Sequence, residues 1–262
     1  MKLKRLAAAL AATLAAITMF ASGYSFINQG QNSTESSTKQ YQSLGGLDKK
    51  EYQKLAALNY KSGENVVVFV NKNNSTLKTK WIKNQIFYQN LDSLNRTSSS
   101  VTAYLDSKNL VQHSKRTRQT WRPTGWHGNR PGQEIYNRGH LIAYSLSNGI
   151  NKFGKYTGKS NGDLDNPKNL FTQTAYTNQN VQTYYENQVR EAMYSRQKVI
   201  YQATPIFRGT EKMARGVNLQ AVSTDGMLNF NVYIFNVQPG YSFDYQNGRA
   251  YVNNNMKVRF NQ

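Results

Sequence analysis

The sequence of 262 residues contains no cysteine and only three histidines, His113, His127 and His140. Without cysteine the chain can form neither a disulfide bond nor a thiolate-metal site, and it has no cysteine nucleophile. With so few histidines, a metal centre built from several imidazole ligands is not expected. Covalent cysteine chemistry is therefore excluded, and a metal site with several histidine ligands is disfavoured.

Acidic residues are also scarce, with 14 Asp and Glu against 33 Lys and Arg, which gives a formal net charge of +19. Such an excess predicts attraction to polyanions, including nucleic acid, anionic lipid headgroups and acidic wall polymers. Hydrophobic residues make up 38% of the chain and aromatic residues 12%, enough to bury a core. The length allows one large domain or two small ones, and no internal repeat or domain boundary is seen after residue 46.

Long apolar stretches are absent except at the N-terminus. Residues 6–21 are almost uninterruptedly apolar and follow Lys2, Lys4 and Arg5. This pattern, with small residues at 21–23, is typical of an export signal, and the run is shorter than the ~20 residues of a spanning helix. We expect residues 1–23 to be a cleaved signal peptide, with an uncleaved N-terminal membrane anchor as the alternative. Both place the protein outside the cell, secreted or anchored at the outer face of the membrane.

Residues 24–45 are rich in Ser, Thr, Asn, Gln and Gly and have no helical or strand periodicity. Such a composition is typical of a flexible linker. The sequence therefore predicts a domain at residues 46–262, connected to the N-terminal segment by this linker.

Within the domain, hydrophobic periodicity predicts an α+β fold with a mainly antiparallel sheet. Helices are expected at 47–58 and 174–196, turns at 91–96 and at Asp225-Gly226, and strands at 65–71, 78–88, 101–105, 197–207, 217–222 and 228–237. The strand at 65–71 has the short apolar run of a buried strand. The last twenty residues are expected to pack on the edge of the sheet.

Residues 112–130 are basic and aromatic, and Pro123 and Gly125 predict a loop rather than a regular element. A basic loop with exposed aromatic rings suits a phosphate backbone with room for stacking. The candidate substrate-binding residues are Lys115, Arg116, Arg118, Arg122 and Trp126. The alternative is that the tryptophans of this loop are core anchors and the arginines merely solvated.

Three side chains later in the chain suit the hydrolysis of a phosphodiester bond. His140 offers a base for water, since histidine titrates near neutral pH. Asn178 offers an oxygen ligand, the kind that Mg²⁺ prefers while it keeps several waters. Arg138 offers a guanidinium that matches phosphate oxygens.

Spacing adds Glu186 to this set. Asn178, Gln182 and Glu186 follow one another at intervals of four, so they drift along one flank of a helix. Plainer interpretations remain open: His140 as a structural histidine, Asn178 as a helix N-cap, and Glu186 as a surface residue paired with Arg190.

Asn137-Arg138-Gly139-His140 resembles the Asp/Asn-Arg-Gly-His signature of the DNA/RNA non-specific endonucleases with a ββα-metal (His-Me finger) site. Within that family the chain most resembles the DNA-entry nucleases and secreted streptococcal-type DNases. Further stretches resemble the same subgroup in the same order, at 91–96, 122–126, 166–169, 173–179, 184–186 and 204–207. The resemblance covers roughly residues 60–255.

The resemblance implies a ββα-metal unit set into the sheet, with His140 as the general base and Asn178 as the direct protein ligand of Mg²⁺, for which Mn²⁺ is an alternative. Glu186 would act through the waters of the metal, Asn169 would order the site, and Arg138 would contact phosphate or brace the loop. DNA, and also RNA, would be cleaved without sequence specificity to products with 5′-phosphates. Asn137 stands where many relatives have Asp, which removes a carboxylate from the site.

Two other functions remain in view. A noncatalytic surface protein would use the same positive charge to bind DNA or other polyanions. A sequence-specific homing or restriction enzyme of the wider His-Me group is disfavoured by the export signal and by the lack of a recognisable base-reading module. No obligate protein partner is inferred, and DNA uptake, nutrient scavenging and degradation of extracellular DNA traps are equally compatible with the sequence.

Overall fold

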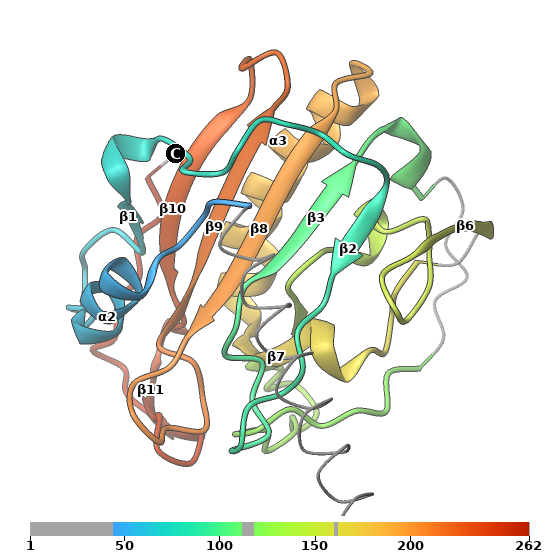
Figure 1. Ribbon diagram of the computed structural model, residues 1–262. Helices are drawn as coiled ribbons and strands as arrows, with labels where there is room; N and C mark the ends of the chain where they lie inside the picture. The colour runs from blue at the N-terminus through green and yellow to red at the C-terminus, as the bar shows by residue number, and fades with distance from the viewer. Residues whose placement is uncertain (1–43, 112–117, 160–161, 262) are drawn as a thin grey trace, which may run out of the picture. The chain divides into compact units, whose positions relative to one another are not determined.

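A six-stranded antiparallel sheet is the centre of the fold (Figure 1). The computed structural model describes residues 44–111, 118–159 and 162–261. The strands lie in the order β1-β10-β9-β8-β3-β2. Their bounds are β1 Val67–Phe69, β2 Gln85–Phe87, β3 Val101–Leu105, β8 Val199–Ile206, β9 Gly216–Ser223 and β10 Asn229–Phe235.

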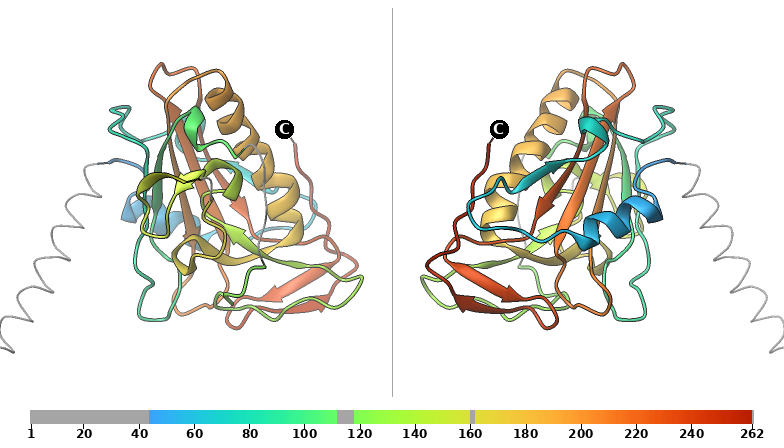
Figure 2. Two further views of the ribbon diagram at one scale, coloured as in Figure 1. Left: turned by 90° about the vertical axis from the view of Figure 1, so that its right-hand side faces the viewer. Right: turned by 90° about the vertical axis from the view of Figure 1, so that its left-hand side faces the viewer.

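One face of this sheet is apolar and lies under helix α3 (Thr183–Tyr194), as Figure 2 shows. The helix buries Tyr185, Val189 and Met193, and the Tyr185 ring contacts the Phe230 ring of β10 at 5.2 Å between centroids. Phe230 pairs with Ala221 of β9, so both project to the same side. Burial of apolar side chains such as these is the main favourable contribution to the free energy of folding.

The opposite face of the sheet carries buried polar side chains. Thr102, Gln202, Gln220 and Asn231 are successive cross-strand partners, and all four are buried. The Leu47 amide donates to Gln202 Oε1 at 3.0 Å and the Thr76 amide to Gln220 Oε1 at 2.9 Å. Backbone segments thus cover this face by hydrogen bonding to its side chains, and helix α2 (Lys49–Ala57) lies on the same side (Figure 2).

A separate pair of strands carries the signature motif. Strands β4 (Tyr136–His140) and β7 (Leu170–Thr174) pair antiparallel, with His140 opposite Leu170. Directly after β7 the chain enters a helix, whose π-helical segment η5 (Thr177–Gln182) continues into α3. This is the expected ββα arrangement, with His140 at the end of one strand and Asn178 in the first turns of the helix.

Short elements complete the chain. They are the 3₁₀ helices η1 Asn71–Asn73, η2 Ser107–Asn109, η3 Tyr144–Leu146 and η4 Pro167–Asn169, and the two hairpins β5 Gly149–Ile150 with β6 Tyr156–Lys159 and β11 Tyr241–Asp244 with β12 Arg249–Val252. Every strand pair among these described elements is antiparallel. The fold is therefore α+β with a mainly antiparallel sheet, as predicted.

Several expected elements are confirmed. The strand at 101–105, the strands around the Asp225-Gly226 turn and the first helix lie within a few residues of their predicted positions. The turn at 91–96 is present and closed by an ion pair between Arg96 Nε and Asp92 Oδ2 at 2.8 Å. The described part of the basic loop, 118–130, contains no helix and only an isolated bridge at Arg130.

Four predictions need correction. The strand expected at 65–71 is an edge strand of three residues with Phe69 63% exposed, not a buried strand. The strand expected at 78–88 is limited to 85–87.

The second helix does not begin at Thr174, because Thr174 pairs with Tyr136 as the last residue of β7. The last residues do pack beside the edge strand, since the Val66 amide donates to the Arg259 carbonyl at 2.8 Å and the Asn261 amide to Asn65 Oδ1 at 3.2 Å. Residues 241–252, however, form their own hairpin.

The expectations for residues 1–23 and 24–45 concern a segment of which only residues 44 and 45 are described, and they stay predictions. In the described ranges, no helix combines the length and apolar character that crossing a membrane requires.

Asn236 connects the main sheet to the β4–β7 unit. Its Oδ1 accepts from the Thr174 amide at 2.8 Å, and its Nδ2 donates to the carbonyls of Thr172 and Ala214 at 3.1 and 3.0 Å. We expect Asn236→Ala to lower the free energy of unfolding by about 3 kcal/mol, because it leaves three backbone groups without these partners. Urea denaturation measures the change. The exposed Asn255→Ala is the control, and equal stability of the two variants would contradict the assignment.

Candidate active site

A cavity of about 560 Å³ opens between the end of β4 and the start of the helix. Five of the predicted site residues line it: Trp126, Arg138, His140, Asn178 and Glu186. They come from stretches far apart in the sequence, so only the fold brings them together.

The His140 ring is oriented by a backbone carbonyl. Its Nε2 lies 2.9 Å from the carbonyl oxygen of Leu164, which also accepts from Gln119 Nε2 at 3.0 Å. A carbonyl only accepts, so Nε2 carries the hydrogen, and in the neutral ring Nδ1 then holds the lone pair. The structural interpretation of this histidine is correct in part, since the ring makes a structural hydrogen bond, but the same ring also lines the cavity.

Gln182 joins the three elements that carry the site. Its Nε2 donates to the His140 carbonyl at 2.7 Å and to Glu186 Oε1 at 2.8 Å, and its Oε1 accepts from Gln173 Nε2 at 2.9 Å. The side chain is 1% exposed. Sequence spacing placed Gln182 between two candidates but gave it no role, because its partners are known only once β4, β7 and the helix meet.

Asn169 does not line the cavity. Its Oδ1 accepts from the Ile142 amide at 2.9 Å and its Nδ2 donates to the Ile142 carbonyl at 3.0 Å. The side chain is fully buried and so holds the backbone that leaves β4 just after His140. Asn169 is therefore a positioning residue rather than one that meets a ligand.

Asn178 lies in the π-helical segment and lines the cavity. The N-cap interpretation is wrong, because the helix begins at Ala175 and Asn178 therefore lies inside it. No hydrogen bond to the Asn178 side chain is found in the described ranges. Its amide oxygen is thus available for a ligand.

Glu186 is buried, 8% exposed, so it is not a surface residue. Burial raises the pKa of its carboxyl to about 7, against the opposing effects of the Gln182 hydrogen bond and the Arg190 charge. The expected ion pair with Arg190 is not among the four ion pairs of the described residues. Arg190 instead donates to Ser145 Oγ at 2.7 Å and to Asn187.

These donors fit a Mg²⁺ ion. Mg²⁺ takes oxygen ligands, keeps several waters and needs one or two protein groups, and the cavity offers the amide oxygen of Asn178 and the carboxylate of Glu186. A buried carboxylate without an ion-pair partner is stabilised in its charged form by a bound cation. Among the described residues no group of three His, Asp or Glu forms a denser metal site.

Arg138 also lines the cavity and is braced by the basic loop. Its Nε donates to the Trp121 carbonyl at 2.5 Å and its Cζ lies 4.5 Å from the centre of the Trp126 ring. Asp165 holds this loop by accepting from the amides of Thr120 and Trp121 at 2.9 and 3.0 Å. Burial alone would raise the pKa of Asp165, but these bonds and the Arg138 charge lower it.

Two of the remaining predicted substrate-binding residues are not brought into the cavity, and the other two are not described. Arg118 and Arg122 are exposed on the loop and do not line it, and Lys115 and Arg116 lie outside the described residues. Neither Trp121 nor Trp126 is buried, so neither is a core anchor. The cavity also contains residues that the sequence analysis missed or placed elsewhere, namely Gln119, Asn129, Ser145, Gln179, Thr183 and Arg190.

The burial of Glu186 has a measurable effect on stability. The folded protein keeps the proton up to about pH 7, whereas the unfolded chain loses it near the ordinary glutamate pKa of 4.5, so stability falls as the pH rises between these values. We expect Glu186→Gln, which cannot ionise, to be more stable than wild type at pH 8 in EDTA, by up to about 3 kcal/mol. Thermal unfolding measures this. The exposed Glu191→Gln is the control, and a destabilised Glu186→Gln would refute the argument.

The sequence matches a known protein family and a characterised relative. The family model for DNA/RNA non-specific endonucleases matches residues 71–225. A deoxyribonuclease of Streptococcus dysgalactiae subsp. equisimilis is 26% identical over 224 residues, which is 72% of this chain and 66% of that protein, just under two thirds of its length.

Two solved structures are similar to this chain. The crystal structure of NucA from Streptococcus agalactiae with magnesium ion bound has a TM-score of 0.64 and 29% identity, covering 79% of this chain and 99% of that one. The structure of the same protein with no metal bound has a TM-score of 0.61 and 30% identity, covering 78% and 96%. Because the family model spans more than half of the sequence, this chain belongs to the DNA/RNA non-specific endonuclease family, with the ββα-metal fold.

Proposed function

We propose that this chain is an exported, Mg²⁺-dependent endonuclease that hydrolyses phosphodiester bonds of DNA, and also of RNA, without sequence specificity. The observation that carries the proposal is the meeting of His140, Asn178 and Glu186 in one cavity. A base on one wall and oxygen donors on the other are what hydrolysis of a phosphodiester requires.

In this proposal His140 is the general base. The Leu164 carbonyl fixes Nε2 as the protonated nitrogen, so Nδ1 takes a proton from the attacking water. Gln182 holds the backbone of His140 and the carboxylate of Glu186 at once, which fixes the base relative to the oxygen donors. Arg138, whose guanidinium lies over the Trp126 ring, places a positive charge near the scissile phosphate.

Asn178 would ligate the Mg²⁺ directly and Glu186 would hold its waters. When bound, the ion polarises the phosphoryl oxygen and stabilises the charge on the leaving oxygen. The magnesium in the related NucA structure supports this choice of metal, and Mn²⁺, which takes similar ligands, is the expected substitute.

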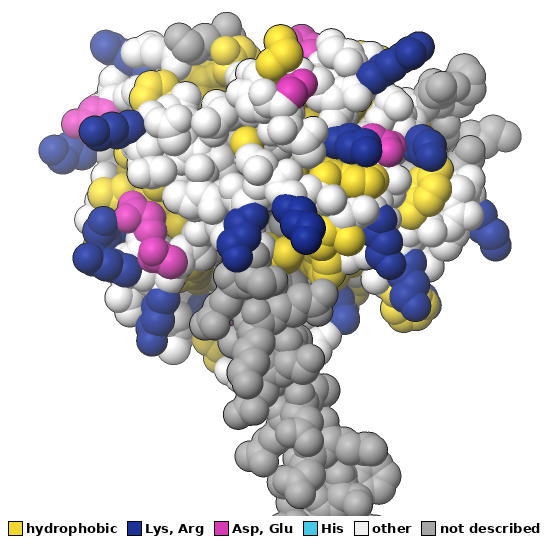
Figure 3. All heavy atoms as spheres, turned by 45° about the horizontal axis from the view of Figure 1, so that its top comes forward, with side chains coloured by type: hydrophobic (Ala, Val, Ile, Leu, Met, Phe, Trp, Pro, Cys, Tyr) yellow, Lys and Arg dark blue, Asp and Glu magenta, His cyan; other side chains and the backbone are white. Residues whose placement is uncertain are grey.

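The lack of sequence specificity follows from how the charge is distributed. On the face in Figure 3 the Lys and Arg side chains are spread out and outnumber the acidic ones, and the whole chain carries a net charge of +19. Phosphate contacts supply affinity without reading bases. Export rests on the N-terminal pattern of the sequence, and secretion and anchoring at the outer membrane face are both consistent with it.

The first test is plasmid cleavage by the purified domain. We expect wild type to degrade plasmid with Mg²⁺ but not with EDTA, and His140→Ala to lose cleavage by at least about a hundredfold, since a general base contributes 10²–10⁴-fold. DNA affinity and thermal stability of the variant must match wild type. If wild type binds plasmid and leaves it intact with every divalent metal, the protein is a noncatalytic polyanion-binding protein instead.

Activity should also depend on salt. We expect kcat/KM on plasmid to fall at least about tenfold between roughly 50 and 200 mM NaCl, because each phosphate contact releases counterions. Initial rates at subsaturating DNA measure this. A flat profile over that range would show that electrostatic contacts do not supply the affinity.

A further inference from the structure

A second cavity, of about 420 Å³, lies beside the catalytic cavity. Asn129 and Tyr136 line both, so they form the partition between them. The outer wall of the second cavity comes from the β11–β12 hairpin, near the C-terminus of the chain. Its volume lies within the range of cavities that bind one small molecule.

The second cavity is positively charged. Arg130 and Arg249 line it, and no Asp or Glu is among its lining residues. Both arginines are exposed, and neither takes part in the four ion pairs of the described residues. Their guanidinium groups are therefore available to an anionic ligand, and guanidinium matches phosphate oxygens in particular.

Aromatic rings lie among these charges. Tyr241, Tyr251 and His127 line the same cavity, and Tyr251 is 54% exposed on strand β12. An exposed tyrosine beside an arginine gives a surface on which a nucleobase stacks while its phosphate is neutralised. A lipid headgroup or a wall polymer would use the charge but not the rings.

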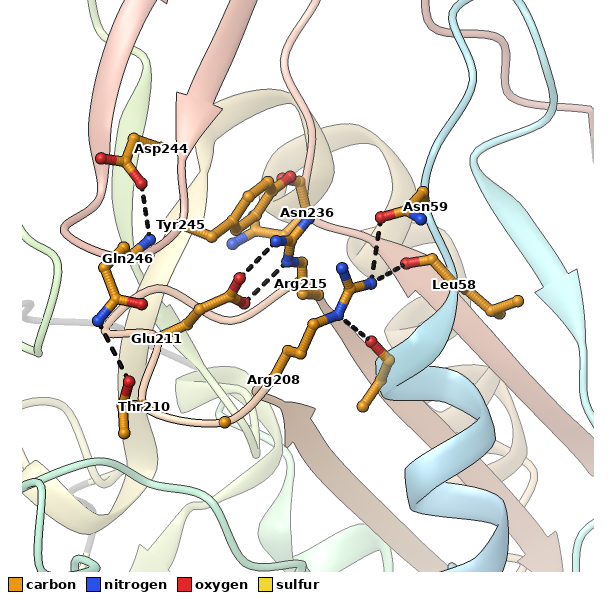
Figure 4. Close-up of polar contacts among 12 residues, drawn as sticks. Leu58, Asn59, Arg208, Thr210, Glu211, Arg215, Asn236, Asp244, Tyr245 and Gln246 are labelled. Atoms are coloured by element: carbon orange, nitrogen blue, oxygen red, sulfur yellow. Dashed lines mark hydrogen bonds and ion pairs between the residues drawn. The ribbon is translucent and has the colours of Figure 1, made fainter.

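The hairpin is fixed relative to the catalytic base. The Tyr136 hydroxyl donates to the Gly248 carbonyl at 2.7 Å, and its ring meets Phe243 edge-on at 5.7 Å. A second attachment comes from Tyr245, whose hydroxyl donates to the Asn236 carbonyl at 2.8 Å; Figure 4 draws both residues. Tyr136 begins the strand that His140 ends, so the second cavity keeps a set position beside the first.

We infer that the second cavity is a subsite for a nucleotide that flanks the scissile phosphate in the bound strand. Arg130 and Arg249 contact its phosphates and Tyr251 stacks on its base. A nucleic-acid strand that occupies the catalytic cavity continues past Asn129 and Tyr136 into the second cavity. The inference rests on the proposed function, since it assigns a further part of the same substrate.

Binding in EDTA tests the subsite without cleavage. A fluorescent single-stranded oligonucleotide of about a dozen nucleotides is titrated with wild type, Arg249→Ala, Tyr251→Ala and Tyr251→Phe, and anisotropy gives Kd. We expect each alanine variant to bind at least about fivefold more weakly, the lower end of the loss of one stacking contact, and Tyr251→Phe to keep the affinity of wild type. Lys78→Ala, which removes an exposed charge lining neither cavity, is the matched control.

If Arg249→Ala and Tyr251→Ala bind like Lys78→Ala, with unchanged melting temperatures, the subsite is refuted. Photocrosslinking gives an independent result: an oligonucleotide carrying 5-iodouracil should attach to the peptide that contains Tyr251, and attachment only elsewhere overturns the inference. Plasmid cleavage separates the two claims. A protein that cleaves DNA but shows no loss in these variants retains the proposed function without the subsite, and one that shows the loss but never cleaves retains the subsite alone.

Discussion

The hydrogen bonds of the Gln182 amide are the constraint on which the geometry of the site depends. One buried side chain bonds the backbone of His140, the carboxylate of Glu186 and the amide of Gln173. Both of its donor hydrogens and its acceptor oxygen are in use, and each partner would be a buried polar group without a bond if the amide were lost. His140 on β4 and Glu186 on the helix are therefore held relative to each other by one side chain that does not itself line the cavity.

The π-helical segment η5 explains how residues eight apart line one cavity. In a regular α-helix, Asn178 and Glu186 would differ in direction by roughly 80°, since each residue turns about 100°. A π-helix closes i→i+5 bonds and turns less per residue, so the segment 177–182 reduces this drift. It is held in place by Thr177 Oγ1, which lies 3.0 Å from the carbonyl oxygens of both Phe235 and Val237 and shares its one hydrogen between them.

The sequence predicted local features well and long-range ones poorly. The β-branched runs and the Asp225-Gly226 turn located β8, β9 and β10, because strand propensity and turn chemistry act locally. The motifs located His140, Asn178 and Glu186, which line the cavity. The local composition made Arg118 and Arg122 candidate substrate-binding residues. Charge predicts attraction to a polyanion but not the position of a side chain, and both residues lie outside the cavity. No sequence pattern marks the Leu164 carbonyl, which bonds His140, or Asn129, which lies between the two cavities. A backbone oxygen and a common amide side chain acquire these roles only from their positions in the fold.

The burial of Glu186 supports the proposed cation site. Burial raises the pKa of its carboxyl, so the charged form costs free energy that a glutamine at the same position would not. Arg190, one helical turn away, would offset this cost if it formed an ion pair, yet its guanidinium bonds Ser145 and Asn187. A buried carboxyl group without an ion-pair partner among the described residues, in a cavity that Asn178 also lines, is hard to explain as a structural feature. It is explained if the missing positive charge is the proposed Mg²⁺, which would lower the pKa of Glu186 on binding.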